Sequence, residues 1–157
     1  MPHIAMEYAI MLPILILQVL LLPLSTSWIM TLWVDSRMHL ELQDVANHMS
    51  STLQQLYFSF NSEDTLPGTM SHKPEVPAFI ESYPYYAIGM LRATSQANFS
   101  KILDIHLALQ GKDISANSST TFGPNVKWQT SIFRSNSSTS LIRVQKFPNG
   151  TFLFSFG

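Results

Sequence analysis

Four asparagines stand in the pattern Asn-X-Ser/Thr, which is the acceptor sequence for N-linked glycans. Among the seven asparagines of the chain, they are Asn98, Asn117, Asn136 and Asn149. Ser and Thr are abundant around them, so composition alone produces some such matches. Asn117, Asn136 and Asn149 fall in segments that we predict to be turns, where an attached glycan is exposed. We therefore expect N-linked glycans on a domain that faces the outside of the cell.

Residue types that could take part in catalysis or metal binding are scattered along the chain. It has no cysteine, which excludes disulfides, thiolate metal ligands and a cysteine nucleophile. His39 and His48 are too far apart to share a helical face closely, and Asp104 and His106 share a predicted strand face without a third ligand or a nucleophile. We find no phosphate-binding loop, serine-centred elbow or metal-ligand spacing. We expect no enzyme activity, no catalytic residue, no metal and no cofactor other than glycans.

The charge balance also limits the choice of partners. Nine basic and ten acidic residues give a formal net charge of −1, and the basic residues form no cluster. The electrostatic pattern typical of nucleic-acid binding is therefore missing, and we expect no nucleic-acid partner. A chain of 157 residues predicts a single folded domain besides any membrane segment.

Residues 8–34 contain no formally charged side chain. As a helix this run is about 40 Å long at about 1.5 Å per residue, whereas the hydrocarbon core of a bilayer is about 30 Å thick. It is about twice as long as the apolar core of a secretory signal, and residues 1–7 contain no Lys or Arg. We therefore predict a retained helix that spans a membrane or is buried among copies of itself.

Glu7 is the acidic residue at the start of this apolar helix. One interpretation places it in the lipid headgroups, because a carboxylate near a helix N-terminus is stabilised by about 0.3–1 kcal/mol. The other places it inside a filament, where a buried charge requires a partner such as the N-terminal amine of an adjacent subunit. The sequence leaves both interpretations open.

Two prolines and two tryptophans mark positions within the apolar run. Pro13 and Pro23 each remove one backbone donor, and the serine and threonine residues after Pro23 can satisfy freed backbone groups in lipid. We expect the helix to bend rather than end at these prolines. Trp28 and Trp33 fit either an aromatic belt at a membrane interface or ordinary packing.

A single apolar stripe continues the helical period beyond residue 34. Its members follow one another at steps of three or four residues: Met38, Leu42, Val45, Met49, Leu53, Leu56 and Phe60. Polar and charged residues fill the opposite face, so this pattern predicts an amphipathic continuation of the same helix.

The remainder of the chain predicts short strands. Residues 61–82 are rich in proline and predict a loop without a regular element. Alternating apolar residues, which we expect to form buried strand faces, are Tyr86/Ile88/Met90, Leu103/Ile105/Leu107/Leu109, Val126/Trp128/Ile132, Ile142/Val144 and Phe152/Phe154/Phe156. The sequence Pro-Asn-Gly at 148–150 predicts a hairpin. About five strands in sequence suggest an antiparallel meander that the helical stripe covers.

These patterns predict an α+β fold, with one long N-terminal helix followed by a small antiparallel β-sheet domain. We divide the chain into an apolar helix at 1–34, its amphipathic continuation at 35–60, a loop at 61–82 and a surface-exposed β domain at 83–157. A β domain this small buries only about 60–70% of its unfolded surface. We therefore expect the helix, neighbouring subunits or both to support it.

Residues 4–17 read IAMEYAIMLPILIL, which resembles the N-terminal helix of type IV pilins and Tad-pilus pseudopilins. In both, an acidic residue enters an apolar helix and a proline follows six residues later. The resemblance implies a lollipop-shaped subunit whose helix packs in a filament core. The partners that it implies are further copies of the chain in a helical homopolymer, the membrane before assembly, the pilus assembly machinery and a prepilin peptidase. In its lack of cysteine and its glycan-type surface, the chain is similar to archaeal adhesive pilins.

We therefore hypothesise that the chain is the major subunit of a type IV pilus-like filament at the cell surface, serving adhesion or cell contact. The residues that we expect to take part in assembly are Glu7, Pro13, Ile14, Leu17, Leu21, Trp28 and Trp33. The alternative is a single-pass, membrane-anchored binding protein or a minor pseudopilin of a secretion system.

Overall fold

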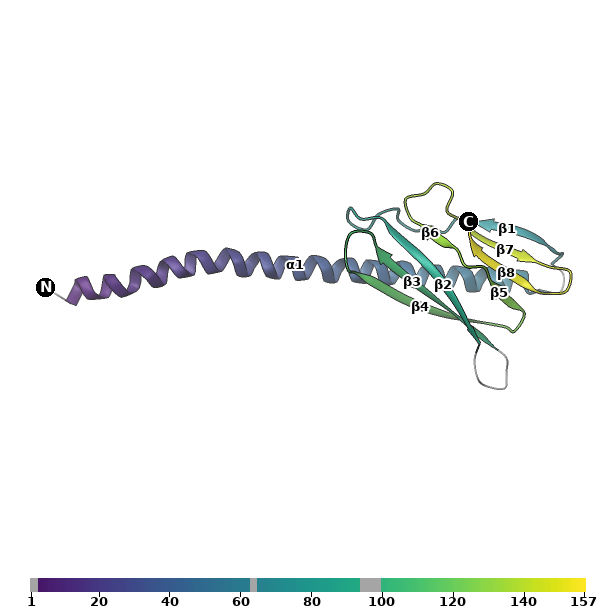
Figure 1. The fold of residues 1–157 in the computed structure, drawn as a ribbon, viewed down its shortest axis with the longest axis horizontal. Helices are drawn as coiled ribbons and strands as arrows, with labels where there is room; N and C mark the ends of the chain where they lie inside the picture. Colours follow the sequence, from purple (N-terminus) through teal and green to yellow (C-terminus); the bar gives the residue numbers. More distant parts are fainter. Residues whose placement is uncertain (1–2, 63–64, 94–99) are drawn as a thin grey trace. The chain divides into compact units, whose positions relative to one another are not determined.

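A computed structural model describes residues 3–62, 65–93 and 100–157, with side chains from residue 11 onward. The fold is α+β, with one long N-terminal helix followed by a small β domain that is mostly antiparallel (Figure 1). The chain divides into two compact units, Met1–Arg37 and Met38–Gly157. The β domain therefore forms one unit with the second half of the helix, whereas the residue pattern predicts a β domain that starts at residue 83.

Helix α1 (His3–Phe60) accounts for the first unit as far as Arg37. Pro13 and Pro23 both lie inside it, and the helix ends at neither. The expectation that it continues through these prolines is confirmed. In this segment the helix follows a gentle curve (Figure 1), as long helices commonly do.

The second half of α1 supplies one side of the core of the second unit. Six members of the predicted stripe, from Met38 to Leu56, are buried, and the seventh, Phe60, is half-buried against the same core. Ala46 and Tyr57 are buried beside them. Each large side chain buried in this way contributes about 1.5–3 kcal/mol to folding. The helix is therefore part of the β domain's core.

Eight strands complete the second unit: β1 (Gly68–His72), β2 (Tyr85–Ala93), β3 (Lys101–Leu109), β4 (Ser115–Phe122), β5 (Val126–Trp128), β6 (Ile132–Arg134), β7 (Ile142–Lys146) and β8 (Phe152–Phe156). They form two four-stranded sheets, in the orders β1-β7-β8-β5 and β4-β3-β2-β6. The prediction of one meander is wrong, because the strands divide between two sheets and β5 pairs with β8 in parallel. Strand β4 was not among the predicted strands. Strand β1 lies in the segment that was expected to be a loop without a regular element. Its own residues show no strand pattern, and the strand forms because its backbone pairs with that of β7.

The predicted buried faces are confirmed for β3, β7 and β8 but not for β2 and β6. In β2 the buried residues are Tyr85, Ala87 and Gly89, whereas Met90 of the predicted set is exposed. Ile132, which was grouped with β5, belongs to β6 in the other sheet and is exposed, while its neighbour Phe133 is buried. Both alternating sets of β2 contain apolar residues, so the alternation alone does not decide which face is buried.

Aromatic side chains join the two sheets to the helix. The ring of Tyr57 on α1 meets Phe122 of β4 and Phe152 of β8 edge-on, with centroids 5.3 and 5.5 Å apart. Phe156 of β8 meets Phe133 of β6 in the same manner. Edge-to-face pairs of this kind add about 0.5–1.5 kcal/mol beyond their buried area. The helix and both sheets therefore share one core.

The β domain also supplies a hydrogen-bond donor to the backbone carbonyls at the C-terminal end of α1. The Nζ of Lys146 donates hydrogen bonds to the backbone carbonyls of Phe60, Ser62 and Thr65, at 2.9, 3.0 and 2.8 Å. The last carbonyls of a helix lack partners within the helix and form the negative end of its dipole. Because the last turn of α1 has no basic residue of its own, a lysine from β7 supplies the positive charge.

Candidate functional site

The surface of α1 between residues 11 and 34, called here the apolar helix surface, is the largest exposed apolar feature of the described chain. Its large hydrophobic side chains, from Met11 to Val34, are between 39% and 76% exposed. The helix is apolar on all sides here, a pattern found in helices that are buried or span a membrane. By length and composition it can cross a membrane, and none of its most apolar stretch is buried. This surface is therefore compatible with membrane insertion.

Hydroxyl groups within the apolar helix surface are satisfied by the helix itself. Thr26 Oγ1 and Ser25 Oγ donate to the carbonyl of Leu22 at 2.8 and 3.0 Å, and Thr31 Oγ1 donates to the carbonyl of Ser27 at 3.0 Å. These bonds remove the cost of placing a free hydroxyl in an apolar environment. We expected such hydroxyls to bond the carbonyl four residues before Pro23, which the proline leaves without its donor. They bond the carbonyls of Leu22 and Ser27 instead.

The residues predicted to take part in assembly, other than Glu7, lie on this surface. Ile14, Leu17, Leu21, Trp28 and Trp33 are all exposed, and Pro13 is exposed within the helix. The side chain of Glu7 lies outside the described residues. Whether these residues contact other subunits stays a prediction.

The predicted glycan acceptors have different local structures. Asn136 and Asn149 lie in turns and are exposed, as expected. Asn117 is exposed but lies inside strand β4, so its placement in a turn is wrong. Its Oδ1 lies 2.7 Å from Nδ1 of His106 on β3, and its backbone carbonyl accepts a hydrogen bond from Gln43. Asn98 lies outside the described residues.

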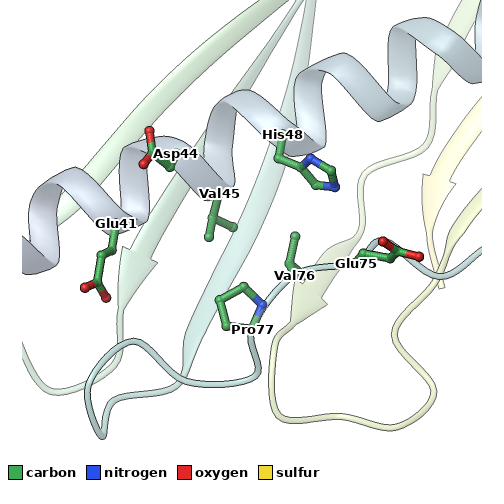
Figure 2. A pocket seen from close by; sticks show the side chains of 7 residues that line it. All are labelled: Glu41, Asp44, Val45, His48, Glu75, Val76 and Pro77. Atoms are coloured by element: carbon green, nitrogen blue, oxygen red, sulfur yellow. The ribbon is translucent and has the colours of Figure 1, made fainter.

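A shallow groove of about 360 Å³ lies between the second half of α1 and the chain after β1. It is lined by Glu41, Asp44, Val45 and His48 of the helix and by Glu75, Val76 and Pro77 of the loop. Figure 2 shows the carboxylates of Glu41, Asp44 and Glu75 pointing in different directions. Because a metal ion requires converging oxygen ligands, this geometry does not form a metal site. Sequence reasoning missed the groove, since its two sides are brought together only by the fold.

The outward side of the sheet β4-β3-β2-β6, called here the outer face, has an apolar centre and a polar rim. Met90 and Ile132 are 65% and 52% exposed, and the half-buried Ile88 pairs directly with Ile132. Arg92 and Asp104 form an ion pair at the rim. The hydrogen bond to Asp104 raises the pKa of Arg92, and the negative charge of Asp104 acts in the same direction. Asp104 and His106 share this face, as the alternation predicts.

Comparison with known proteins adds no relative. Neither family models nor curated proteins nor solved structures match this chain. Its function must therefore be argued from its own residues.

Proposed function

We propose that this chain is the structural subunit of an extracellular filament of the type IV pilus kind, assembled by burial of the apolar helix surface against the helices of neighbouring copies. The observation that carries the proposal is the exposure of every large apolar side chain from Met11 to Val34. Soluble monomers seldom expose apolar patches of more than a few hundred Å². A surface of this kind requires another apolar environment around it.

The energy available from this burial is large. Burying half of these side chains at about 1.5–3 kcal/mol each amounts to tens of kcal/mol before the costs of ordering. Leu17 and Leu21 lie one helical turn apart and present neighbouring contact points along the helix. A filament built in this way would be very stable.

The length of the uncharged run favours sister helices over lipid alone. A helix of about 40 Å is about a third longer than a hydrocarbon core of about 30 Å, so in lipid alone it must tilt or leave part of its apolar length outside. Packing against parallel copies buries the whole run. The membrane then holds the subunit before assembly, and a pilus assembly machinery and a prepilin peptidase are the partners that this route requires.

The β domain is proposed to form the outside of the filament, where it serves adhesion or cell contact. The sequons at Asn136 and Asn149 are exposed in turns of that domain, which supports a glycoprotein at the surface of an archaeal cell with extracellular N-glycosylation. Its outer face offers exposed apolar side chains for contact with other surfaces.

A second candidate is a single-pass membrane protein that binds a partner through its β domain, or a minor pseudopilin of a secretion system. The outer face favours it, because Met90 and Ile132 form an exposed apolar centre with the Arg92–Asp104 pair at its rim. Binding surfaces combine an apolar centre with a polar rim in this way.

The deciding experiment examines material sheared from cells that produce the chain. We expect electron microscopy and mass spectrometry to show fibres that contain it as the main component. If the chain stays in detergent-solubilised membranes as a monomer and no fibre contains it, the filament proposal is wrong and the second candidate replaces it.

The substitution Leu17→Asp tests the role of the apolar helix surface. A charge placed there costs several kcal/mol to bury unless it is paired, so we expect no fibres. Leu17→Ile keeps the volume and the apolar character and serves as the matched control, with fibres retained. Normal fibre yield from Leu17→Asp, at equal amounts of protein in the cell, would falsify the packing of this surface in a filament core.

A further inference from the structure

The hairpin between β7 and β8 holds Asn149 in a defined turn. The backbone N–H of Gly150 donates to the carbonyl of Phe147 at 3.0 Å, and the N–H of Phe147 donates to the carbonyl of Thr151 at 2.9 Å. Gly150 has a φ of 74°, which glycine adopts at little cost. This is the pattern of a type I turn followed by one left-handed residue, which is common in hairpins of this length.

Within this turn the sequon folds back on itself. The backbone N–H of Thr151 donates to Oδ1 of Asn149 at 3.1 Å, which is an Asx-turn. It brings the side-chain amide of Asn149 close to residue Thr151. The two residues that define the acceptor sequence therefore lie close together, with Asn149 exposed and Thr151 half-buried.

The turn is held in place from the core. Asn125 donates from Nδ2 to the carbonyl of Gly150 at 2.9 Å and accepts from the hydroxyl of Tyr57 at 3.3 Å. Tyr57 belongs to the buried side of α1. A chain of hydrogen bonds thus connects the helix to the tip of the hairpin, which makes the turn a preformed feature of the fold.

A pocket of about 350 Å³ lies directly beside the acceptor. It is lined by Lys127, Phe147, Asn149, Thr151 and Leu153. Two of these are members of the sequon, two are half-buried apolar side chains, and Lys127 is exposed at the edge strand β5. Pockets for small molecules combine apolar walls with a few polar groups and have volumes of roughly 300–1,000 Å³. The apolar face of a pyranose ring suits Phe147 and Leu153, and its hydroxyls suit Lys127.

The other described sequons lack this arrangement. Asn117 lies in strand β4, where the side chain two residues later stands about 6–7 Å away along the strand. Its Oδ1 contacts His106 on the neighbouring strand, whereas Oδ1 of Asn149 accepts from the backbone N–H of its own sequon. Around Asn136 the local side-chain bonds are made by Ser137, whose hydroxyl contacts Thr139.

We propose that Asn149 is the preferred glycan acceptor among Asn117, Asn136 and Asn149, and that the first sugar of its glycan lies in the pocket formed by Phe147, Leu153 and Lys127. The co-reactant is a lipid-linked glycosyl phosphate. Nδ2 of Asn149 forms a bond to C1 of the sugar, the C1–O bond to the phosphate breaks, the phosphate leaves with the electron pair, and the proton that Nδ2 releases passes to the solvent. The inference rests on the outward placement of the β domain in the proposed function.

Site occupancy is the first test. The full chain is produced in its own cells, and intact-glycopeptide mass spectrometry measures the glycan on each asparagine, in the wild type and in Asn149→Gln and Thr151→Ala. We expect the highest occupancy at Asn149, its loss in both variants, and unchanged values at the other sites. Asn136→Gln is the matched control and should leave Asn149 occupied. Equal or higher occupancy at Asn117 or Asn136, or a bare Asn149, overturns the proposal.

The contact of the sugar with the pocket is tested by a double-mutant comparison. The glycan should raise the Tm of the chain relative to Asn149→Gln, and this increment should disappear when Leu153→Ser is present, with the sequon intact and still occupied. If the glycan raises the Tm equally with and without Leu153→Ser, the sugar does not lie in the pocket and this part of the proposal is wrong. Lys127→Gln, at an exposed position, repeats the comparison without removing an apolar side chain.

The same samples separate this inference from the proposed function. Fibres that contain the chain with a bare Asn149 support the filament and overturn the glycan proposal. A glycosylated Asn149 on a chain that stays in the membrane supports the glycan proposal and overturns the filament.

Discussion

At the scale of single residues, Tyr85 shows how a polar group is accommodated in the core. Its side chain is fully buried, and its hydroxyl donates to the carbonyl of Pro77 at 2.7 Å. This hydrogen bond ties the loop after β1 to strand β2. Burial disfavours the phenolate and raises the pKa of Tyr85 above its ordinary value.

The raised pKa predicts how stability depends on alkaline pH. The unfolded chain releases the Tyr85 proton near its ordinary pKa of about 10, whereas the folded chain retains it. Its contribution to stability is therefore complete below about pH 10 and is lost as pH rises through the folded pKa. We expect Tyr85→Phe to lose about 0.5–1.5 kcal/mol at neutral pH, from the missing hydrogen bond, and to decline less steeply above pH 10. Urea denaturation at several pH values measures the stability loss at neutral pH and the decline above pH 10. If the stabilities of the two proteins fall in parallel above pH 10, the prediction is contradicted.

At the scale of elements, α1 is one continuous helix with two different surfaces. Up to residue 34 its side chains are exposed and apolar on all sides, whereas from Met38 its stripe is buried in the β domain. The end of the helix depends on β7, because Lys146 supplies the three hydrogen bonds to the carbonyls at and beyond Phe60.

This contact predicts the effect of removing the lysine charge. Lys146→Met keeps the aliphatic stem but leaves the carbonyls of Phe60 and Thr65 without their donor. Hydrogen bonds to charged groups contribute about 1.5–3 kcal/mol, so we expect the free energy of unfolding to fall by about this amount. Lys73→Met, at an exposed loop position, is the control and should change stability little. Chemical denaturation followed by circular dichroism makes the measurement, and equal stability of the two variants would argue against the capping role.

At the scale of the whole molecule, the two compact units differ in what they need from their surroundings. The unit Met38–Gly157 contains all of the buried hydrophobic core. The unit Met1–Arg37 has no buried side chain among its described residues. The second unit therefore holds the packed core, whereas the first exposes an apolar helix that is compatible with membrane insertion.

This division predicts the outcome of truncation. A chain that begins at Met38 keeps the helical stripe and should fold as a soluble protein, whereas one that begins at Tyr83 lacks the stripe and β1 and should not fold. Buried Leu or Met side chains cost about 2–5 kcal/mol each when removed, which exceeds the stability of a small domain when several are lost. Cooperative thermal melting and dispersed amide NMR signals should be present for the first fragment and missing for the second. A folded fragment from Tyr83 would show that the β domain does not need the helix.

Local periodicity was enough to predict several features of this protein. The uncharged run at 8–34, the stripe from Met38 to Phe60, the buried faces of β3, β7 and β8, and the hairpin at 148–150 all follow from patterns within short stretches of sequence. Each of these features depends on neighbours in the chain, because helical and strand periods decide which side chains share a face.

Only the tertiary structure decided the features that depend on distant partners. In β2 both alternating sets contain apolar residues, and Gly89 is buried because the indole of Trp128 occupies the space where a Cβ would lie. Strand β1 exists through its pairing with β7, Asn117 lies inside β4 through pairing with β3, and Lys146 reaches the end of α1 from 86 residues away. These contacts join segments far apart in the chain, and the free energy of long-range packing, rather than local propensity, selects them.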